Sequence, residues 1–196
     1  MPDYLEQKAV CPFCGGTSTV RICRSVNAAA DPELKDEVRS GRIFLHECPS
    51  CGRQFLIGND MLYHDPDAKF LICLSSTQFN SDGLEGYTCR MVRDAGSLIE
   101  KVKIFEAGLD DVVIELCKYV TASELGKQVD LKFFKMDGPD NAITLAYPQN
   151  GGMEMVEIGF NVYEDCAGIV GRNPSMKEAA SGLAKIDREW LLQFLA

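Results

Sequence analysis

The sequence lacks most of the motifs by which enzyme active sites are recognised. It contains no glycine-rich dinucleotide loop, no phosphate-binding loop, no Gly-x-Ser-x-Gly and no His-Glu-x-x-His. These absences argue against the common nucleotide-dependent enzymes, serine hydrolases and zinc proteases. The 196 residues include two histidines, His46 and His64, so side chains that exchange protons near neutral pH are scarce. No apolar run approaches membrane-spanning length and the stretch 1–8 has no apolar core, so we expect neither a membrane segment nor an export signal.

Basic residues are also fewer than acidic ones. The net charge is −9, which argues against a protein that binds nucleic acid mainly through its phosphates. Residues 1–58 carry seven acidic and seven basic residues, whereas residues 59–196 carry 22 acidic and 13 basic ones. A local contact with nucleic acid is therefore still conceivable in the first part, through Arg21, Arg24, Arg39, Arg42 and Arg53. These arginines form no dense cluster, so we favour solvated positions and keep nucleic-acid binding as an alternative hypothesis.

Cysteine, by contrast, is frequent and patterned. There are nine cysteines, and an odd total with Cys-x-x-Cys pairs predicts a reducing, cytoplasmic location. Cys-Pro-x-Cys-Gly occurs twice, at residues 11–15 and 48–52. In each copy the proline fixes φ in the turn, and the glycine lets the backbone fold back behind the second sulfur. Two such pairs supply the four thiolates of a structural zinc site, so we predict Cys11, Cys14, Cys48 and Cys51 as its ligands.

Two other uses of these four thiols stay open. One is a redox-active dithiol, and the other is a rubredoxin-like iron site, because tetrahedral sulfur suits iron as well as zinc. A site with four protein ligands leaves no position for a catalytic water, so the favoured hypothesis is a structural metal. Three further cysteines, Cys23, Cys73 and Cys117, fall on expected core faces and are predicted to be inert buried thiols.

One short segment has the residue types of a catalytic site. His64, Asp65 and Asp67 lie within four positions of one another and could act as general acid and base, or bind a second metal. The same segment, with Pro66 inside it, is also typical of a turn in which aspartate side chains bond to nearby amides. No activated nucleophile accompanies His64, so we favour the turn and keep an enzyme as the alternative. We expect His46 near the surface or beside the metal ligands, but not on the metal.

The apolar pattern predicts a mixed α+β chain in two parts. Residues 1–93 are expected to form a zinc-ribbon-containing β module with an inserted helix over about 31–40, and residues 94–196 a second α/β portion. The second part is predicted to contain a helical hairpin over 97–121, a small antiparallel sheet over 129–163 and a C-terminal helix over 187–196. Residues 1–10 are predicted as a polar lead-in, and 78–86 and 168–173 as loops.

The surroundings of the two cysteine pairs resemble a known family. Between the pairs stand Val26-Asn27, Asp31-Pro32-Glu33-Leu34-Lys35 and Gly41, and Leu62-Tyr63-His64-Asp65-Pro66 and Phe70 follow them. These residues are similar to the CpXC family of bacterial and archaeal proteins, named for its two Cys-Pro-x-Cys motifs. The resemblance covers about residues 11–74 and extends through the predicted helix pair to about residue 121. The function of that family is undetermined, so the resemblance implies a zinc-bearing fold and supplies no reaction.

These observations lead to one functional expectation. We expect a cytoplasmic, non-enzymatic binding or assembly module with a structural zinc ion. A protein partner or a homodimer is expected, because the hairpins of a zinc ribbon expose strand edges that can pair with another chain. Nucleic acid and membrane are not expected as partners.

Overall fold

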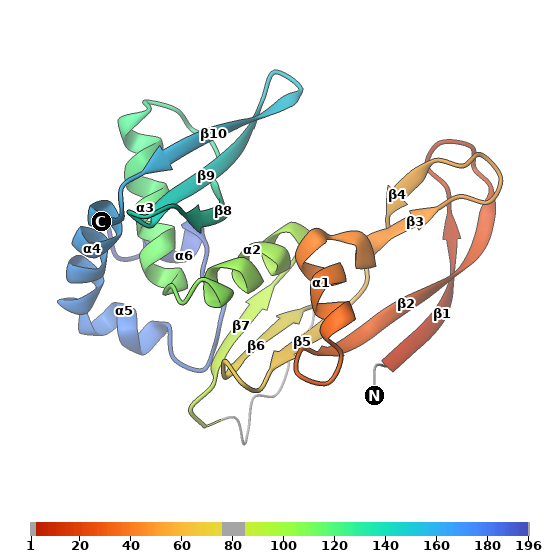
Figure 1. Ribbon diagram of the computed structural model, residues 1–196, viewed down its shortest axis with the longest axis horizontal. Coiled ribbons are helices and arrows are strands. Elements are labelled where there is room, and N and C mark those ends of the chain that lie inside the picture. The colour runs from red at the N-terminus through yellow and green to blue at the C-terminus, as the bar shows by residue number, and fades with distance from the viewer. Residues whose placement is uncertain (1–2, 76–84, 196) are drawn as a thin grey trace. The chain divides into compact units, whose positions relative to one another are not determined.

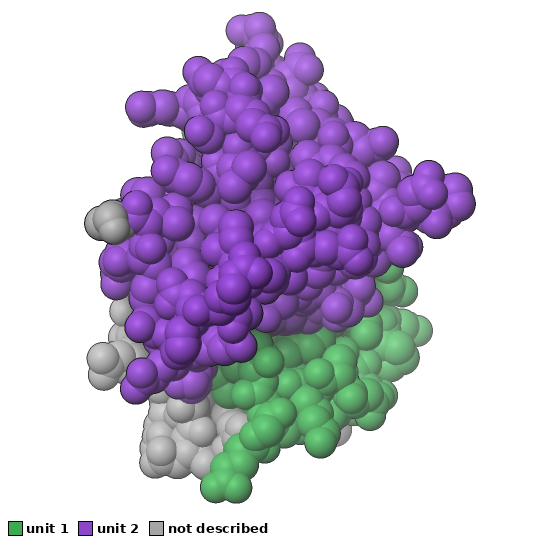
Figure 2. Space-filling model, turned by 90° about the vertical axis from the view of Figure 1, so that its left-hand side faces the viewer, with its two compact units in different colours: residues 1–99 green, residues 100–196 purple. Residues whose placement is uncertain are grey.

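The computed structural model describes residues 3–75 and 85–195, which belong to two compact units. Unit 1 comprises residues 1–99 and unit 2 comprises residues 100–196 (Figure 2). The division falls inside helix α2 (Ala95–Glu106), and the domain boundary expected at 93/94 lies just before that helix. The polar loop expected over residues 78–86 lies largely outside the described residues.

Both units combine helices with β-sheet, which confirms the predicted α+β class (Figure 1). The elements that precede α2 are, in chain order, β1 (Asp3–Val10), β2 (Thr17–Asn27), α1 (Pro32–Ser40), a 3-10 turn η1 (Arg42–Phe44), β3 (Leu45–Glu47), β4 (Gln54–Leu56), β5 (Met61–Asp65), β6 (Phe70–Leu74) and β7 (Thr88–Val92). Within the described ranges, no helix is both long and apolar enough to cross a membrane.

A mixed sheet with the order β1-β2-β5-β6-β7 forms the main layer of unit 1. The β1–β2 and β5–β6 pairs are antiparallel, whereas β2–β5 and β6–β7 are parallel. The predicted polar lead-in is wrong, because residues 3–10 form β1 and pair with β2 from Asp3↔Ser25 to Val10↔Thr17. Most side chains of β1 are exposed, so this strand carries little of the apolar alternation that marks a half-buried strand.

The inserted helix is α1, and its ends follow the local chemistry of the sequence. Pro32 occupies the first turn, where its missing N–H costs nothing, and Gly41 ends the helix with φ 76°. Asp31 stands at the N-cap, but its side chain makes no capping hydrogen bond. Val38 is fully buried on this helix, as is Tyr63 on β5, so both belong to the core of unit 1.

Unit 2 continues from α2 with helices around a second sheet. Its elements are α3 (Asp111–Glu124), β8 (Lys132–Asp137), β9 (Ala142–Gln149), β10 (Gly152–Ile158), α4 (Phe160–Gly171), α5 (Pro174–Ala179), β11 (Leu183–Ala184) and α6 (Arg188–Leu192). Strands β8, β9 and β10 form an antiparallel meander in the order β10-β9-β8.

Two predictions for the end of the chain are wrong in part. The third strand of the meander was expected to run to residue 163, but β10 ends at Ile158 and Phe160 begins helix α4, which also takes up most of the expected loop 168–173. Phe160 and Tyr163 stack at a centroid distance of 5.2 Å, the neighbour relation that helical i, i+3 spacing produces. The C-terminal helix is also shorter than the expected 187–196, since α6 covers Arg188–Leu192.

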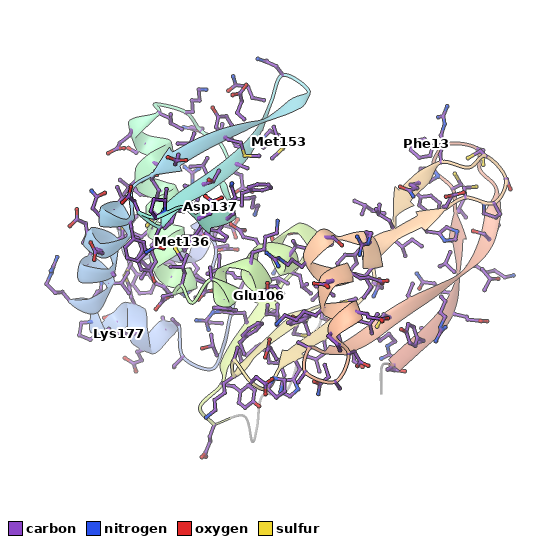
Figure 3. All side chains as sticks on the ribbon, in the orientation of Figure 1. Phe13, Glu106, Met136, Asp137, Met153 and Lys177 are labelled. Atoms are coloured by element: carbon purple, nitrogen blue, oxygen red, sulfur yellow. The ribbon has the colours of Figure 1, made fainter. Side chains whose placement is uncertain are left out.

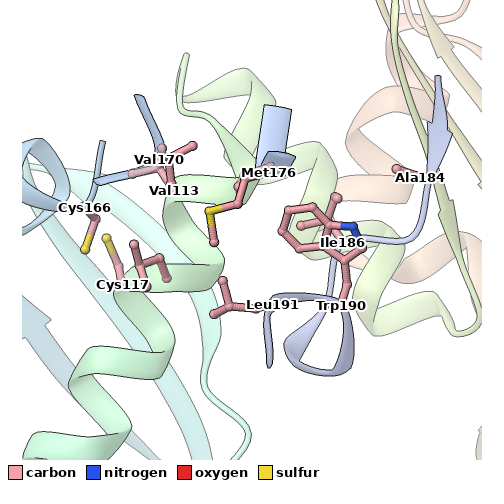
Figure 4. Close-up of a cluster of buried hydrophobic side chains, with 11 residues drawn as sticks. Val113, Cys117, Cys166, Val170, Met176, Ala184, Ile186, Trp190 and Leu191 are labelled. Carbon is pink, nitrogen blue, oxygen red and sulfur yellow. The ribbon is translucent and has the colours of Figure 1, made fainter. Parts of the chain in front are cut away.

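Unit 2 has two apolar clusters. One lies between the meander and α3 and includes Ile114, Leu131, Ile143 and Leu145. The other gathers residues of α3, α4, α5 and α6 around Met176 and Leu191, and includes Trp190 (Figure 4). Since Trp190 is the single tryptophan of the chain, its fluorescence reports on this second cluster.

Candidate metal centre

Each Cys-Pro-x-Cys-Gly segment folds into a tight turn at the end of a hairpin. The first segment connects β1 to β2: the N–H of Gly15 donates to the carbonyl of Cys11 at 2.9 Å, and the N–H of Cys11 donates to the carbonyl of Gly16 at 2.9 Å. The first bond folds the backbone behind the second thiol. Gly15 has φ 72°, a left-handed conformation that costs a residue with a side chain about 1–2 kcal/mol.

The second segment repeats this construction between β3 and β4. The N–H of Gly52 donates to the carbonyl of Cys48 at 2.8 Å, and the N–H of Cys48 donates to the carbonyl of Arg53 at 3.0 Å. Gly52 has φ 70°. The two cysteine knuckles, residues 11–16 and 48–53, therefore have the same backbone hydrogen bonds. The sequence of each segment therefore determines the fold of its own knuckle.

The four thiols of the two knuckles meet at one point. Their sulfur atoms all lie within 4.8 Å of one another, with 3.7 Å between Cys11 and Cys51 and 3.7 Å between Cys14 and Cys48. A tetrahedral ion with bonds of about 2.3 Å to sulfur requires S···S distances of about 3.8 Å. A disulfide would need about 2.05 Å. The spacing therefore fits a metal ion held by four thiolates, and the four cysteines could hold one.

The acidities of these thiols depend on one another. Backbone hydrogen bonds from Ser50 and Cys51 lower the pKa of Cys48 to about 6. At Cys14 a backbone hydrogen bond from Gly16 also favours the thiolate, but hydrogen bonds with the other three thiols outweigh it and raise the pKa to about 12. Ionisation of one thiol thus makes ionisation of its neighbours less favourable. Four thiolates at this distance need a cation between them, and binding that cation releases protons.

The nearest histidine takes no part in the four-cysteine cluster. His46 lies on β3, where its Nε2 is 3.1 Å from the hydroxyl of Ser18 and its ring meets that of Phe55 edge to face at 5.4 Å. It is half-buried and absent from the group of possible ligands. Its contacts instead connect the β3–β4 hairpin to the start of β2.

The three residues of the candidate acid–base site do not converge. His64 and Asp65 are consecutive on β5, so their side chains point to opposite faces of the sheet. His64 lies 3.3 Å from the hydroxyl of Tyr87. Asp65 is buried, accepts from the N–H of Ala68 at 3.0 Å and pairs with Lys35 at 3.2 Å. Asp67 is exposed. Asp65 thus makes the turn contact that the favoured hypothesis expected.

The arginines considered for nucleic-acid binding have separate surroundings. Arg21 lies over the ring of Tyr4 at 3.7 Å, and Arg24 pairs with Asp3 at 3.7 Å. Arg53 lies 5.2 Å from the ring of Phe13, which projects from the first knuckle (Figure 3). Arg39 and Arg42 are also exposed. Each of the first three therefore contacts a different neighbour on unit 1.

The sequence analysis missed a set of buried charges in unit 2. Its members are Glu100 and Lys101 on α2, Asp111, Glu115 and Lys118 on α3, and the less buried Lys132 on β8. Lys118 bonds to Glu115 at 2.7 Å and to Glu100 at 3.1 Å, and Lys101 bonds to Asp111 at 2.6 Å. Burial raises the pKa of Glu115 despite Lys118. At Glu100 burial acts in the same direction, but Lys118 and Lys132 outweigh it and lower the pKa.

The sequence contains a signal for this set of buried charges. The sequence Ser97-Leu98-Ile99-Glu100 has the residue types of a capping box, but the helix begins at Ala95, and Asp94 accepts from the N–H of Ser97 at 2.7 Å. Glu100 instead accepts from the N–H of Phe133 at 2.8 Å. On α3, Asp111, Glu115 and Lys118 are three or four positions apart and therefore share one helical face. Three charged residues on one face of a largely apolar helix indicate a buried ionic contact.

Comparison with known proteins supports a family assignment. No curated protein and no solved structure matches the chain. The family model described as CpXC protein matches residues 9–118, which is more than half of the 196 residues. The match includes both cysteine knuckles and the residues of α2 and most of α3. The resemblance found in the sequence is therefore confirmed, and the chain belongs to the CpXC family.

Proposed function

We propose that Cys11, Cys14, Cys48 and Cys51 hold one structural zinc ion, and that the chain acts as a non-enzymatic binding or assembly module. One observation carries the metal proposal: four sulfurs from two knuckles far apart in sequence lie within 4.8 Å of one another, with two of the distances at 3.7 Å. We favour zinc over iron because closed four-cysteine sites built from two Cys-x-x-Cys pairs are typical of structural zinc. The β1–β2 and β3–β4 hairpins would then form a zinc-ribbon module.

Bound zinc would neutralise the thiolates and join the two hairpins. The protein's part is to orient the sulfurs: the knuckle hydrogen bonds shape each pair, and the contact between His46 and Ser18 joins β3 to β2. Cys11 and Cys48 are buried, with 2% of each exposed. Such a site has no open position for substrate or water, which favours a structural role.

The metal can be tested on the purified chain by native mass spectrometry. We expect one zinc per chain, and less than one in Cys48→Ser. The matched control is Cys73→Ser, which removes a buried thiol of β6 that lies outside the cluster and should leave the metal content unchanged. A bound iron would instead give visible absorption bands from thiolate ligation. A folded chain that contains no metal would refute the proposal.

The surface beside the knuckles supports a binding role. Val10, Phe13, Leu45 and Leu56 are large apolar residues with exposed fractions of 64%, 52%, 43% and 68%. All four lie on the strands or in the knuckle next to the cysteines, and Leu45 stands opposite Leu56 in the β3–β4 pair. Contiguous patches of exposed apolar side chains are common at protein contacts. We therefore propose that a second copy of the chain or another cytoplasmic protein covers them.

Sedimentation of the zinc-loaded chain over a wide concentration range distinguishes a second copy of the chain from a different protein partner. If a second copy binds, Leu56→Ser should shift the chain to monomer. Met153→Ser serves as the control, because Met153 is similarly exposed at 57% but lies on β10 of unit 2. A wild-type chain that is monomeric throughout would refute the homodimer. A different protein partner should then be captured by the wild type and lost with Leu56→Ser.

A further inference from the structure

Two cysteines outside the metal centre face each other in the core of unit 2. Cys117 lies on α3 and Cys166 lies on α4, and their side chains point toward each other (Figure 4). Cys117 is fully buried, and Cys166 keeps 3% of its surface exposed. Both belong to the apolar cluster that contains Val113, Val170 and Met176. Cys166 lies outside the range matched by the family model, residues 9–118.

The two thiols differ in acidity. A hydrogen bond between them lowers the pKa of Cys166 and raises that of Cys117. Cys166 is therefore the thiol of the pair that ionises more readily. Burial opposes ionisation at both positions. Because the thiolate is the nucleophile, and because Cys166 retains the exposed surface of the pair, an oxidant that enters the cluster should react first with Cys166.

We propose that Cys117 and Cys166 form a reversible redox switch, in which a hydroperoxide oxidises the pair to a disulfide that joins α3 to α4. In the first step the thiolate of Cys166 attacks one oxygen of hydrogen peroxide, and the O–O bond breaks to give a sulfenic acid and water. In the second step the sulfur of Cys117 attacks that sulfenic sulfur and a second water leaves. The two thiols lose two electrons and two protons in total, which reduce one peroxide to two waters.

Because Cys117 and Cys166 are far apart in the chain, a disulfide between them should strongly stabilise unit 2. The 48 positions between Cys117 and Cys166 contain β8, β9 and β10, so the bond would close a loop around the whole meander. A loop of about 50 residues restricts the unfolded chain strongly, and the unfolding equilibrium constant of unit 2 should fall by about a hundredfold or more. The melting temperature of unit 2 should rise by about 10 °C.

Peptide mapping tests the bond directly on the full-length, zinc-loaded chain. Cleavage after lysine and arginine places Cys117 in residues 104–118 and Cys166 in residues 136–172, and neither peptide contains another cysteine. After treatment with hydrogen peroxide we expect these two peptides to be linked, to have lost two hydrogen atoms, and to separate on reduction with dithiothreitol. In Cys117→Ser the sulfenic acid should persist at Cys166 and react with dimedone. In Cys166→Ser, Cys117 should stay unmodified.

The fluorescence of Trp190 provides the second measurement, because it lies in the same apolar cluster. Peroxide should raise the melting temperature of the wild type and should not raise that of Cys117→Ser or Cys166→Ser. Cys73→Ser, with its change in unit 1, should respond as the wild type does. The proposal is overturned if native Cys117 and Cys166 stay reduced under peroxide while Cys14 and Cys51 are oxidised. Oxidation of Cys166 to a sulfinic acid with Cys117 still free would overturn it equally.

Discussion

Replacing Lys118 with methionine should destabilise unit 2 more than any exposed substitution. Lys118 is buried, and its ammonium lies 2.7 Å from a carboxylate oxygen of Glu115 and 3.1 Å from one of Glu100. Both acids raise its pKa further above the usual range, against the effect of burial. Removing one partner of a buried ion pair leaves an uncompensated charge, which typically costs 3–5 kcal/mol. Lys132 and the N–H of Phe133 still contact Glu100, so we expect a loss of about 3 kcal/mol.

Urea unfolding followed by Trp190 fluorescence measures this loss. Lys177→Met is the matched control, because Lys177 is an exposed lysine on α5 of the same unit. That change should alter the free energy of unfolding by less than about 0.5 kcal/mol. Adding Glu115→Gln to Lys118→Met should recover about 1 kcal/mol or more, because the second change removes a carboxylate left without its main cation.

The pH dependence of the loss tests its electrostatic origin. Burial already raises the pKa of Glu115 in the folded chain, and the loss of Lys118 should raise it further. A carboxyl group whose folded pKa exceeds its unfolded pKa binds more protons when folded, so the free energy of unfolding falls as pH rises. The cost of Lys118→Met should therefore be smaller at pH 5 than at pH 7. A variant as stable as Lys177→Met, or a cost that grows toward pH 5, would refute this reasoning.

Two further predictions concern unit 1 and can be checked by urea unfolding followed by circular dichroism. Gly52→Ala should lower the free energy of unfolding by about 1–2 kcal/mol, because Gly52 has φ 70°. Gly58→Ala should cost less, since a side chain there would meet only open space and the φ of Gly58 is not positive. Equal losses of stability in the two variants would contradict a backbone origin. Asp65→Ala should cost about 1–3 kcal/mol, because it removes the buried carboxylate that accepts from Lys35 and from the N–H of Ala68. The exposed Asp67→Ala should cost less than about 0.5 kcal/mol, and a reversed order would show that Asp67 has the structural role.

The group of four cysteines that could hold an ion was predictable from sequence because the geometry of each knuckle is local. Each knuckle is set within six residues by its proline, its glycine and two hydrogen bonds, and the duplication identifies the two halves as one site. Strand β1 was missed because its side chains are mostly exposed, so pairing with β2 is what defines it. That pairing depends on residues up to 22 positions apart, such as Asp3 and Ser25.

The helix after Gly159 was misread for a different reason. Val156, Ile158, Phe160 and Val162 alternate as a strand would, but the same stretch also fits a helix once Tyr163, Cys166 and Val170 are included. Burial against α3 selects the helix, and that tertiary contact is not visible in a short window. Likewise His64 and Asp65, adjacent in sequence, are separated by the alternation of β5. The buried charges could be found only by following the face of α3.

The small size of the β3–β4 hairpin has a consequence for regulation. Each of its strands contains three residues, and an isolated two-stranded hairpin is marginally stable at best in water. On the proposed zinc site, the hairpin that presents Leu45 and Leu56 would therefore persist only while its turn is held by the ion. Partner recognition would then follow zinc supply: a cell short of the metal would lose the docking surface while unit 2, which has its own apolar clusters, stays folded.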